Sequence, residues 1–586
     1  MHGFYGKILR INLTTKKTEE DTVPDDVYKK YLGGKGLACH LLYKYLPANV
    51  DPLAPENILV FVTGPVANTT IPAASRYGVF AKSPQTGFLG EAYSGGHTAP
   101  AINSTGYDAI LIEGAAQDPT YLHISSEGVT FGNASDIWGQ ESYSAEDELL
   151  KKVDIKGAQA VVIGPAGENL VNFACIKNNH WRSAGRTGMG AVMGSKKLKG
   201  IVFSGDKKAP LADEEHLTRY VKDLVKTYKN NERSIRMRER GTPYMVTTTN
   251  LESAFPTRYW SEGSYEKWEG ISSDAMLETM EVKPRACYRC FMACGKLSKV
   301  KEGRHKGLTV EGPEYETIYA FGGLCCIDKI TEVAYLNDLC DRLGIDTITA
   351  GNVAAFAIEA GKSGKMSGMP DYGDVDGIAE LLHSIARKEG VGKLLAQGVK
   401  GIAEELGMED VAIHVKGLEP AGYDPRSVPG MSLGYAVSNR GACHLRSSFY
   451  MYEFSGEVPK NMVEGKAKLF VKSENRNTLE DCLIICRFYM KFIGWEGMKE
   501  IVQATTGLDL SIEELEALSS RVTTLTRRFN IREGLRKEDD TIPTRFFTEP
   551  IGPQKEWVIR KEDLDFMLKD YYSLHGWDEE GIPVEQ

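Results

Sequence analysis

Hydrophobic residues follow a short-period pattern over the first 205 residues of the chain. Aliphatic and β-branched runs such as ENILVFVTGP, YDAILIEG and LKGIVFSGD alternate with glycine-rich turns. Short apolar runs bounded by turn residues are typical of β-strands. Few long helical patterns lie between them, so this part predicts β-sheets whose loops gather at one side.

From about residue 210 the apolar residues recur at three- and four-residue spacing. The pattern is clear in DEEHLTRYVKDLVKTYKN, ITEVAYLNDLCDRLG and DGIAELLHSIARKEG, and it is typical of amphipathic helices. The segment EPAGYDPRSVPG interrupts it near Pro420. We therefore predict an α+β protein with a β-sheet-rich N-terminal domain, residues 1–208, followed by two mainly α-helical domains, residues 209–419 and 420–586. No internal repeat at a solenoid period is evident.

Charge and hydropathy narrow the function classes. The chain has 586 residues and a net charge of −10, which argues against a general role on nucleic acid or anionic membranes. No stretch approaches the run of ~20 apolar residues that spans a bilayer. The N-terminal MHGFYGKILRINLTTKK lacks the apolar core of a signal peptide. We expect a cytoplasmic protein.

Three of the eleven cysteines form a cluster, Cys287-x2-Cys290-x3-Cys294. A short loop with this spacing can wrap thiolates around an iron–sulfur cubane and leave one corner for a distant ligand. A structural zinc site is the alternative, but no second C-x2-C or close Cys/His pair follows. An odd cysteine count argues against a disulfide framework. Spacing leaves six candidates for the fourth ligand: Cys325, Cys326, Cys340, Cys443, Cys482 and Cys486.

Glycine-rich segments crowd the N-terminal part, around Gly33–Gly36, Gly95-Gly96, Gly164–Gly167 and Gly185–Gly194. The last one is not a P-loop, because Ser195 precedes Lys196 where G-K-[ST] is needed. Arginines stand beside these loops, and arginine forks suit phosphate oxygens. The pattern favours a phosphate-bearing organic cofactor other than a standard nucleotide.

Taken together, the motifs ASRYGVFAKSPQTGF, AYSGGH, IGPAGENL, RSAGRTGMGAVMGSKKLK, CxxCxxxC, EGPEYET, LCDRLGIDT, RGACHLR and DCLIIC resemble the aldehyde ferredoxin oxidoreductase family. Members of that family carry a tungsten bis-pyranopterin. The resemblance covers nearly the whole chain. It implies a pterin-binding N-terminal domain, a [4Fe-4S] cluster, Mg²⁺ bridging the pterin phosphates, and oxidation of a small aldehyde to a carboxylic acid. Molybdenum in place of tungsten stays open.

The resemblance also assigns residues. The family's paired D-x-x-G-L-[C/D] motifs correspond to Asp341–Asp346 and Asp481–Cys486, the second with Ile484 where the pattern has glycine. By this resemblance Cys486 is the fourth cluster ligand. The positions implied in cofactor binding are Arg76, Tyr93, Ser94, Gly95, Arg182, Ser183, Asp341, Gly344, Ile345, Asp346, Asp481 and Ile485.

For catalysis the resemblance implies Glu316 as the carboxylate near the metal and His444 as its partner, with Glu314 left open as the working carboxylate. A benzoyl-CoA reductase subunit, which places a cysteine at its metal, is the nearest alternative, and Cys325 and Cys326 would suit it. An iron–sulfur electron carrier or zinc scaffold without catalysis is a third possibility. The aromatic segment 449–454 has two interpretations: ordinary core packing, which is the more common role of such a segment, and a wall that favours aromatic or bulky aldehydes.

Electrons are expected to leave to a ferredoxin or ferredoxin-like subunit, and the chain is expected to act as a homodimer or in a complex with iron–sulfur and flavin subunits. Basic residues flank the cysteine cluster: Lys283, Arg285, Arg289, Lys296, Lys299, Lys301, Arg304 and Lys306. We expect some of them to form an exposed positive surface for an acidic ferredoxin.

Overall fold

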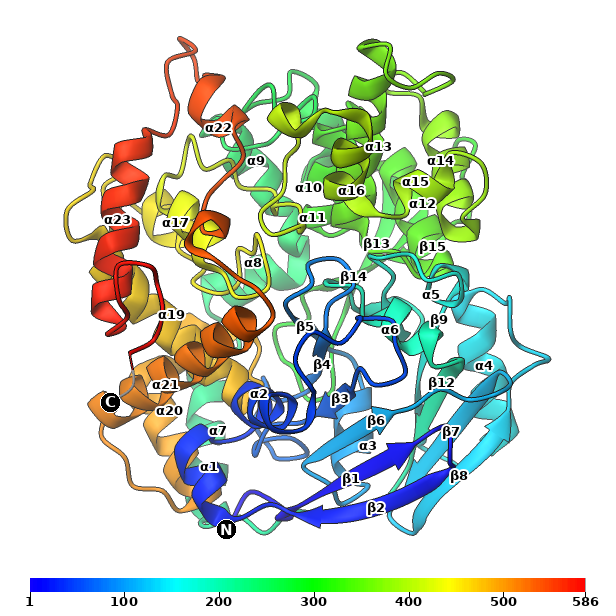
Figure 1. Cartoon of the computed structure of the whole chain (residues 1–586), viewed down its shortest axis with the longest axis vertical. Coiled ribbons are helices and arrows are strands. Elements are labelled where there is room, and N and C mark those ends of the chain that lie inside the picture. The colour runs from blue at the N-terminus through cyan, green and yellow to red at the C-terminus, as the bar shows by residue number, and fades with distance from the viewer. Residues whose placement is uncertain (585–586) are drawn as a thin grey trace.

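The computed structural model describes residues 1–584, and its N-terminal part contains two six-stranded sheets. The first has the order β2(Lys17–Thr22)-β1(Lys7–Asn12)-β6(Ala109–Glu113)-β3(Leu59–Val62)-β4(Tyr77–Lys82)-β5(Leu89–Ser94). The second has the order β11(Arg182–Ala184)-β10(Ile176–Asn178)-β9(Gln159–Ile163)-β12(Leu198–Phe203)-β7(Thr120–Ser125)-β8(Gly128–Asn133). Both lie in the blue and cyan lower half of Figure 1.

The two sheets have the same topology. In each, an antiparallel hairpin (β1–β2, β7–β8) pairs in parallel with the last strand (β6, β12), which pairs antiparallel with the third strand (β3, β9). The remaining two strands follow in antiparallel order. Apolar side chains from both sheets form one shared core between them. The N-terminal part is therefore a structural duplication.

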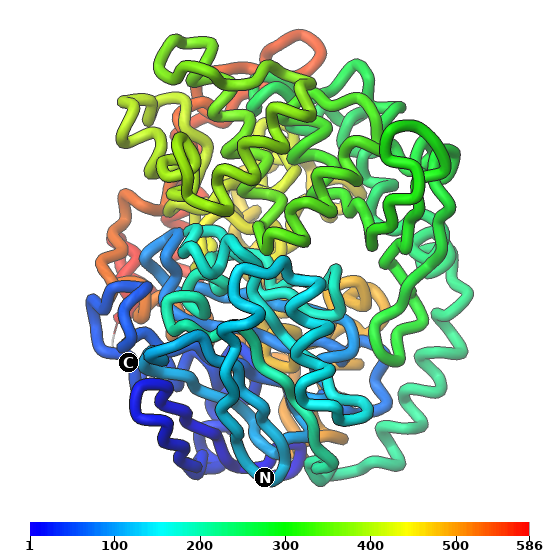
Figure 2. The backbone as a smooth tube through the Cα atoms, turned by 90° about the vertical axis from the view of Figure 1, so that its right-hand side faces the viewer, coloured from blue at the N-terminus to red at the C-terminus, as the bar shows by residue number. Residues whose placement is uncertain are grey.

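Helices of this part are α1(Asp25–Tyr31), α2(Gly34–Tyr45), α3(Thr98–Asn103), α4(Ser142–Val153), α5(Pro165–Glu168) and α6(Met189–Ser195). The remainder is mainly helical, as predicted, with one small sheet of β13(Met280–Arg285), β14(Gly295–Val300) and β15(Thr309–Glu311). Figure 2 shows the β-rich half below the helical half. The fold is thus α+β, with sheets followed by helices.

The helices of the remainder are α7(Glu214–Tyr228), α8(Glu232–Arg240), α9(Met245–Leu251), α10(Ser273–Thr279), α11(Tyr315–Thr317), α12(Ile330–Leu343), α13(Thr347–Lys362), α14(Val375–Arg387), α15(Gly392–Leu395), α16(Gly398–Leu406), α17(Gly430–Val437), α18(Tyr450–Phe454), α19(Lys466–Leu483), α20(Met490–Thr506), α21(Ile512–Arg532), α22(Arg545–Thr548) and α23(Lys561–Leu574). Short 3-10 turns are η1(Thr242–Tyr244), η2(Trp268–Ile271), η4(Glu409–Val411), η5(Arg487–Tyr489) and η6(Lys537–Asp539), and η3(Ile318–Gly323) is π-helical.

Helical segments on both sides of Pro420 share cores with their neighbours. One core joins residues before and after this point, among them Tyr319 and Tyr423. Another joins α19, α20 and α21 to α1, α2 and the first sheet, and α20 and α21 lie beside α1 and α7 in Figure 1. The C-terminal segment therefore connects the helical half back to the sheets. No helix within residues 1–584 combines the length and hydropathy needed to cross a membrane.

Two helix ends press against glycines of the duplicated sheets. α12 ends at Gly344 (φ 77°) and α19 ends at Ile484 (φ 54°), both left-handed. A Cβ at Gly164 would overlap the Leu343 carbonyl, and one at Gly64 would overlap the Leu483 carbonyl. The close backbone approach at the second motif is therefore provided by Gly64, while Ile484 accepts the left-handed conformation, which is costly for a β-branched residue.

Substituting Gly64 tests its contact with the Leu483 carbonyl. We expect Gly64→Ala to lower the free energy of unfolding by about 1–3 kcal/mol, since overpacking against backbone has no side chain to displace. Gly185→Ala is the matched control, because a Cβ there meets only the Ser183 Cβ at 3.6 Å. The measurement is thermal unfolding of both variants beside the parent. Equal midpoints for all three proteins would show that the approach is not tight.

Candidate active site and cluster site

Glu316 and His444 face each other across the interior of the helical half. Glu316 lies in α11, directly before the π-helical turn η3, and His444 lies in the loop before α18. Glu316 Oε1 is 3.4 Å from His444 Nε2, and the Gly422 N–H donates to Glu316 Oε2 at 3.0 Å. The tertiary structure thus pairs the two predicted catalytic residues.

Burial shifts the pKa values of this pair in opposite senses. It raises the pKa of Glu316 to about 8, because the charged carboxylate loses its water. Burial also holds the pKa of His444 well below its usual value, and the nearby Arg440, Arg186 and Arg446 lower it further. The site therefore holds a carboxyl group that titrates near neutral pH next to an imidazole that is neutral there.

Glu314 has different surroundings. Its carboxylate accepts a hydrogen bond from the Thr242 hydroxyl. It also lies close enough to Cys294 to raise the pKa of that thiol. Glu314 is thus turned toward the cysteine cluster, whereas Glu316 is the one that meets His444.

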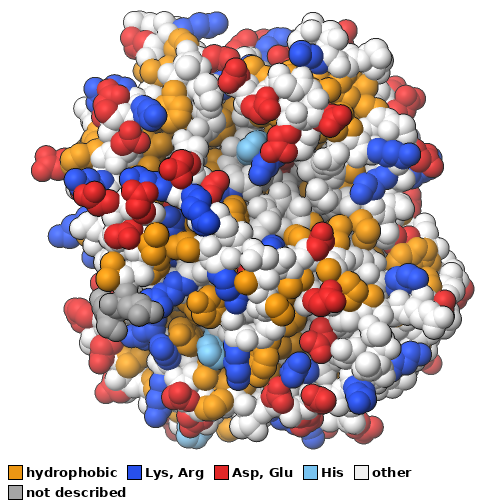
Figure 3. Space-filling view, viewed as in Figure 1, with side chains coloured by type: hydrophobic (Ala, Val, Ile, Leu, Met, Phe, Trp, Pro, Cys, Tyr) orange, Lys and Arg blue, Asp and Glu red, His pale blue; other side chains and the backbone are white. Residues whose placement is uncertain are grey.

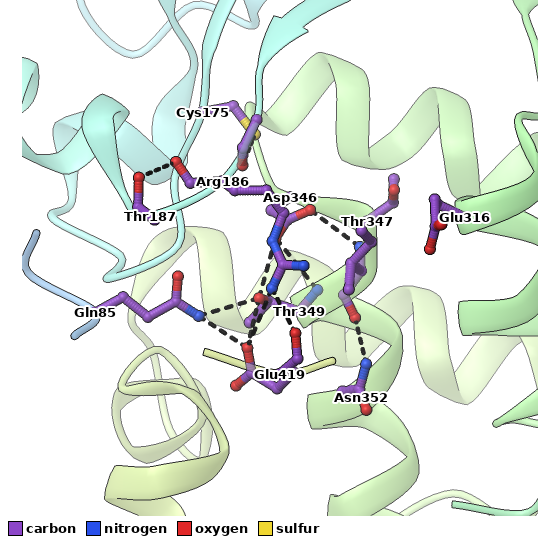
Figure 4. Close-up of polar contacts among 12 residues, drawn as sticks. Gln85, Cys175, Arg186, Thr187, Glu316, Asp346, Thr347, Thr349, Asn352 and Glu419 are labelled. Atoms are coloured by element: carbon purple, nitrogen blue, oxygen red, sulfur yellow. Dashed lines mark hydrogen bonds and ion pairs between the residues drawn. The ribbon is translucent and has the colours of Figure 1, made fainter. Parts of the chain in front are cut away.

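Arg186 forms the centre of a buried polar network beside Glu316 (Figure 4). Its Nε is 2.8 Å from Asp346 Oδ2, and its Nη2 donates to the Glu419 carbonyl at 2.8 Å. The Glu419 carboxylate accepts from Gln85 Nε2 at 2.8 Å and from the Thr349 hydroxyl at 2.7 Å. The network ties the sheets, α13 and the loop after α16 together. Asp346 also caps α13, since its carboxylate accepts from the N–H groups of residues 348 and 349.

Cys443 lies next to His444 and is buried. Arg440 Nη2 donates to its Sγ at 2.9 Å, and the Leu445 N–H donates at 3.3 Å. Burial raises the pKa of this thiol, but the charges of Arg440 and Arg446 outweigh burial and bring it down to about 7. A thiol that titrates near neutral pH therefore lies next to His444.

The first aspartate motif meets basic and amide side chains of the second sheet and of α12. The Asp341 carboxylate binds Lys177 Nζ and accepts from Asn337 Nδ2 at 2.8 Å. Burial raises the pKa of Asp341 to about 6. The N–H groups of Gly344 and Ile345 both donate to the Cys340 carbonyl at 2.9 Å, which closes the end of α12.

The second aspartate motif is surrounded by arginines. Asp481 Oδ2 is 2.6 Å from Arg446 Nη1, and its Oδ1 is 2.7 Å from Arg487 Nη2. Arg446 also binds the buried Glu91, whose pKa falls to about 2 because Arg446 and Lys35 outweigh the effect of burial. The Ile485 N–H donates to the Glu480 carbonyl at 2.8 Å, as the corresponding turn does at α12.

Several buried guanidinium nitrogens near this motif have no hydrogen-bond partner among residues 1–584: Nε of Arg440, Arg446 and Arg487, and Nε and Nη2 of Arg476. Buried donors are normally satisfied. Arginine donors suit phosphate and other anionic groups. The donor set therefore fits an anionic cofactor that carries phosphates.

The remaining predicted cofactor residues lie directly before β4, at the end of β5 and on β11. Arg76 Nη2 donates to the Tyr93 carbonyl at 3.4 Å, and Ser94 donates to Asn178 Oδ1 at 2.6 Å. A Cβ at Gly95 would lie 3.0 Å from Cys287 Sγ, so a side chain there would crowd this thiol. Two further side chains are held by ionic partners: Arg182 binds Glu311, and Ser183 accepts from Lys177.

The four predicted cluster cysteines come together near Arg76 and Gly96. The Gly96 N–H donates to Cys287 Sγ at 3.3 Å, and the Tyr489 hydroxyl is 3.3 Å from Cys290 Sγ. Arg76 Nη1 lies 3.9 Å from Cys486 Sγ. Burial raises the pKa of Cys294, and the neighbouring thiols of Cys486 and Cys287 add to the rise. All four are half-buried.

Cys482 is different. It lies inside α19 and belongs to the core that joins α19 to the first sheet. Within residues 1–584 no three His, Cys, Asp or Glu side chains converge to hold a single metal ion. A cubane instead binds its thiolates at separate iron corners.

Cys325 and Cys326 lie away from the site. Cys325 is buried and its thiol donates to the carbonyls of Ala320 and Gly351 at 3.6 and 3.5 Å. The pKa of Cys326 is raised to about 11 by burial, although the nearby Arg258 lowers it. Neither thiol contacts Glu316 or His444.

Aromatic rings line the approach to His444. Tyr423 and Tyr450 stack with centroids 3.8 Å apart, and their centroids are 5.5 and 6.1 Å from the imidazole. Phe454 packs against both tyrosines. Phe449 points elsewhere, into the core against Phe470. Part of the aromatic segment, Tyr450 and Phe454, therefore lies on the side of His444, whereas Phe449 belongs to the core.

Sequence reasoning missed several residues of the site. Lys177 and Glu91 are charged residues within apolar strand runs, CIKNN and LGEAYS, and such a break in a buried run was a usable signal. Cys443 was identified only as a candidate ligand. Glu419 and Tyr423 lie in the interrupting loop EPAGYDPRSVPG, whose sequence does not show that they are buried.

Family models cover nearly the whole chain. The model described as "Aldehyde ferredoxin oxidoreductase, N-terminal domain" matches residues 8–205, and that for "domains 2 & 3" matches residues 219–586. The chain belongs to the aldehyde ferredoxin oxidoreductase family. Its resemblance to this family, inferred from the motifs, is thereby confirmed, and it is an oxidoreductase of this family.

Relatives within the aldehyde ferredoxin oxidoreductase family differ in the substrates their names state. The tungsten-containing aldehyde ferredoxin oxidoreductases of Pyrococcus furiosus and Thermococcus kodakarensis are each 36% identical, covering 100% of this chain and 98% of the relative. The aliphatic sulfonate oxidoreductase WOR-like subunit of Pyrococcus furiosus is 32% identical, covering 100% and 96%.

A solved structure shares the fold of this aldehyde ferredoxin oxidoreductase family chain. It is the active-site complex BamBC of benzoyl coenzyme A reductase with 1,5-dienoyl-CoA. Its TM-score is 0.83 at 23% identity, covering 100% of this chain and 96% of that one.

Proposed function

We propose that the chain oxidises aldehydes to carboxylic acids and passes the electrons through a [4Fe-4S] cluster to a ferredoxin or ferredoxin-like subunit. The observation that carries this proposal is the buried Glu316–His444 pair. The reaction takes an aldehyde and water to an acid, two protons and two electrons. It needs a base for water and a hydrogen-bond donor for the carbonyl oxygen.

The cofactor we propose is a tungsten bis-pyranopterin, with molybdenum as the alternative metal and Mg²⁺ between the pterin phosphates. When bound, it supplies the two-electron oxidation. Asp341 and Asp481 with their neighbouring turns would hold the pterin rings, and the buried arginine donors would hold the anionic groups. The four cysteines Cys287, Cys290, Cys294 and Cys486 would ligate the cluster, and Arg76 lies beside Cys486.

Residues of the chain itself accept the proton and position the substrate. Glu316 in its ionised form accepts a proton from water or an aldehyde hydrate, and its pKa of about 8 suits proton transfer near neutral pH. His444 stays neutral because burial depresses its pKa, so it donates a hydrogen bond from Nε2 to the carbonyl oxygen. The rings of Tyr423 and Tyr450 exclude water on the substrate side.

We place the enzyme in the cytoplasm on the strength of its cysteines. None of the eleven forms a disulfide in the described residues 1–584. Reduced thiols persist in the cytosol, whereas disulfides form in oxidising compartments.

Anoxic purification, metal analysis and a viologen-linked substrate screen test the proposal. We expect iron and tungsten in the protein and viologen reduction by aldehydes. An aliphatic sulfonate and benzoyl-CoA are the comparison substrates, chosen because the relatives named above act on such compounds. Zinc without tungsten or molybdenum, or turnover confined to a comparison substrate, would refute the proposal.

The Tyr423–Tyr450 stack makes a second test. We expect Tyr450→Ala to raise the KM for benzaldehyde about 10-fold, because an aromatic contact contributes about 0.5–1.5 kcal/mol, and to leave acetaldehyde nearly unchanged. Tyr452→Ala is the control, since Tyr452 packs on Phe449 in the core direction at 5.7 Å. The same KM change for both aldehydes would argue that Tyr450 only stabilises the loop.

A further inference from the structure

A groove of about 680 Å³ opens on the surface of the sheet-rich half. It lies between α3, the ends of β7 and β12, and the loop that leads from α4 to β9. Its lining includes His97, His123 and Tyr288. The groove is separate from the Glu316–His444 pair. The proposed aldehyde oxidation does not use the groove.

One end of the groove reaches the proposed cluster. Tyr288 follows Cys287 directly, and its N–H donates to the Gly96 carbonyl at 3.0 Å. The Gly96 N–H in turn donates to Cys287 Sγ at 3.3 Å. The Tyr288 ring meets His97 edge-on at 6.2 Å. Tyr288 thus lies in the groove wall and is also the neighbour of Cys287, a proposed cluster ligand. A partner in the groove would therefore contact the loop that holds this ligand.

The groove is more positive than the chain as a whole. Lys156, Lys207 and Lys208 line it and are exposed, against two carboxylates, Glu127 and Asp206. Burial lowers the pKa of both groove histidines, so they add no charge at neutral pH. Arg289, beside Tyr288, is also exposed and adds a further positive charge. In contrast, the chain carries a net charge of −10, and Figure 3 shows both signs mixed across the face it displays.

The other cations near the cysteines differ in their surroundings. Lys296 is buried, and its Nζ donates to four backbone carbonyls. Arg304 pairs with Glu332 and Asp376. Lys301 donates to the carbonyls of residues 277 and 278, and Lys299 stands exposed on β14. Lys283, Lys299, Lys301 and Lys306 are exposed and enter no ion pair within residues 1–584, and the same holds for the three groove lysines. What distinguishes the groove lysines is that they line a hollow that also contains Tyr288.

We propose that this groove is the docking site of an acidic ferredoxin, an inference that rests on the proposed function. In each encounter one electron passes from the reduced cluster to the oxidised ferredoxin, and two encounters complete one aldehyde oxidation. Opposite charge speeds such encounters, and salt weakens the effect beyond a Debye length of about 8 Å at physiological ionic strength. The groove lysines steer the partner, and Tyr288 lies at its contact with the cluster loop.

Charge reversal in the holoenzyme tests the site. The double variant Lys207→Glu/Lys208→Glu should slow reduction of a purified acidic ferredoxin at least ~10-fold at low salt. Its Kd for oxidised ferredoxin, measured by titration without turnover, should weaken by a similar factor. Aldehyde-dependent reduction of benzyl viologen should stay unchanged, because a small dye needs no groove. The matched control is Lys299→Glu/Lys301→Glu, which reverses two charges on and next to β14 and should leave the ferredoxin rate and Kd unchanged.

The outcomes separate the two proposals. Unchanged ferredoxin kinetics and affinity in the groove variant would overturn the docking site, and so would an effect confined to the β14 variant. Failure of the parent enzyme to reduce viologen with any aldehyde would refute the proposed function instead. A loss of viologen reduction in the groove variant alone would show a structural effect and would also overturn the docking role.

Discussion

We expect Glu316→Gln to lower aldehyde turnover by at least ~10²-fold while metal and iron content stay at the parental level, since a positioned base contributes roughly 10²–10⁴-fold. The substitution keeps the shape of the side chain and its contact with the Gly422 N–H, but it removes the group that accepts the proton. The measurement is viologen-linked kcat and kcat/KM under anoxic conditions. His444→Ala should give a loss of similar size, because the carbonyl oxygen then lacks its donor.

The pH dependence of kcat/KM tests the same role of Glu316. Burial raises the pKa of Glu316 to about 8, and only the ionised form can accept a proton. The kcat/KM of the parent should therefore rise about tenfold per pH unit below that value and level off above it. Glu316→Gln should flatten the rise.

Glu314→Gln is the matched control. Glu314 binds the Thr242 hydroxyl and is turned toward the cysteines, so we expect near-parental turnover and an unchanged profile. If Glu314→Gln lost the activity and Glu316→Gln kept it, the two carboxylates would exchange roles. Near-parental activity in both Glu316→Gln and His444→Ala would remove the proposed mechanism.

We expect Cys486→Ala to remove or convert the proposed iron–sulfur cluster and to reduce electron transfer to ferredoxin below detection. Four thiolates hold a cubane. Cys486 lies beside Arg76 and close to the three cysteines of the C-x2-C-x3-C cluster. The measurements are iron content, electron paramagnetic resonance of the reduced protein and ferredoxin reduction.

Cys482→Ala controls for the loss of a nearby cysteine. Cys482 is a core residue of α19, so its truncation should lower stability and leave the iron content unchanged. Loss of iron in the Cys482 variant with retention in the Cys486 variant would show that the assignment of the DCLIIC motif is wrong.

The sequence by itself determined the order of the fold and the family to which the chain belongs. Strand-length apolar runs up to residue 205 and helical periodicity after residue 210 correspond to β1–β12 and α7–α23, because side-chain periodicity is a local property. The C-x2-C-x3-C spacing is also local. The family was recognised because many short motifs occur in the same order, and the family models confirm it.

The tertiary structure decided which residues meet. Glu316 rather than Glu314 faces His444, because the turn into η3 directs alternate side chains to different neighbours. Cys486 reaches the other cysteines because α19 ends at the left-handed Ile484 and the chain leaves the helix before it. Cys482, one helical turn earlier, remains in the core.

Long-range packing also produced features without a local signal. The two sheets share one topology although no sequence repeat is evident, since topology depends on which strands pair and different side chains can satisfy the same pairing. Arg186, Asp346 and Glu419 come from three distant segments, and only burial makes their mutual neutralisation necessary. Of the basic residues beside the cysteines, Lys283 and Lys299 are exposed, whereas Lys296 is internal and donates to carbonyls. Exposure is a property of the folded surface, so the groove lysines, distant from the cysteines in sequence, could be recognised only from the structure.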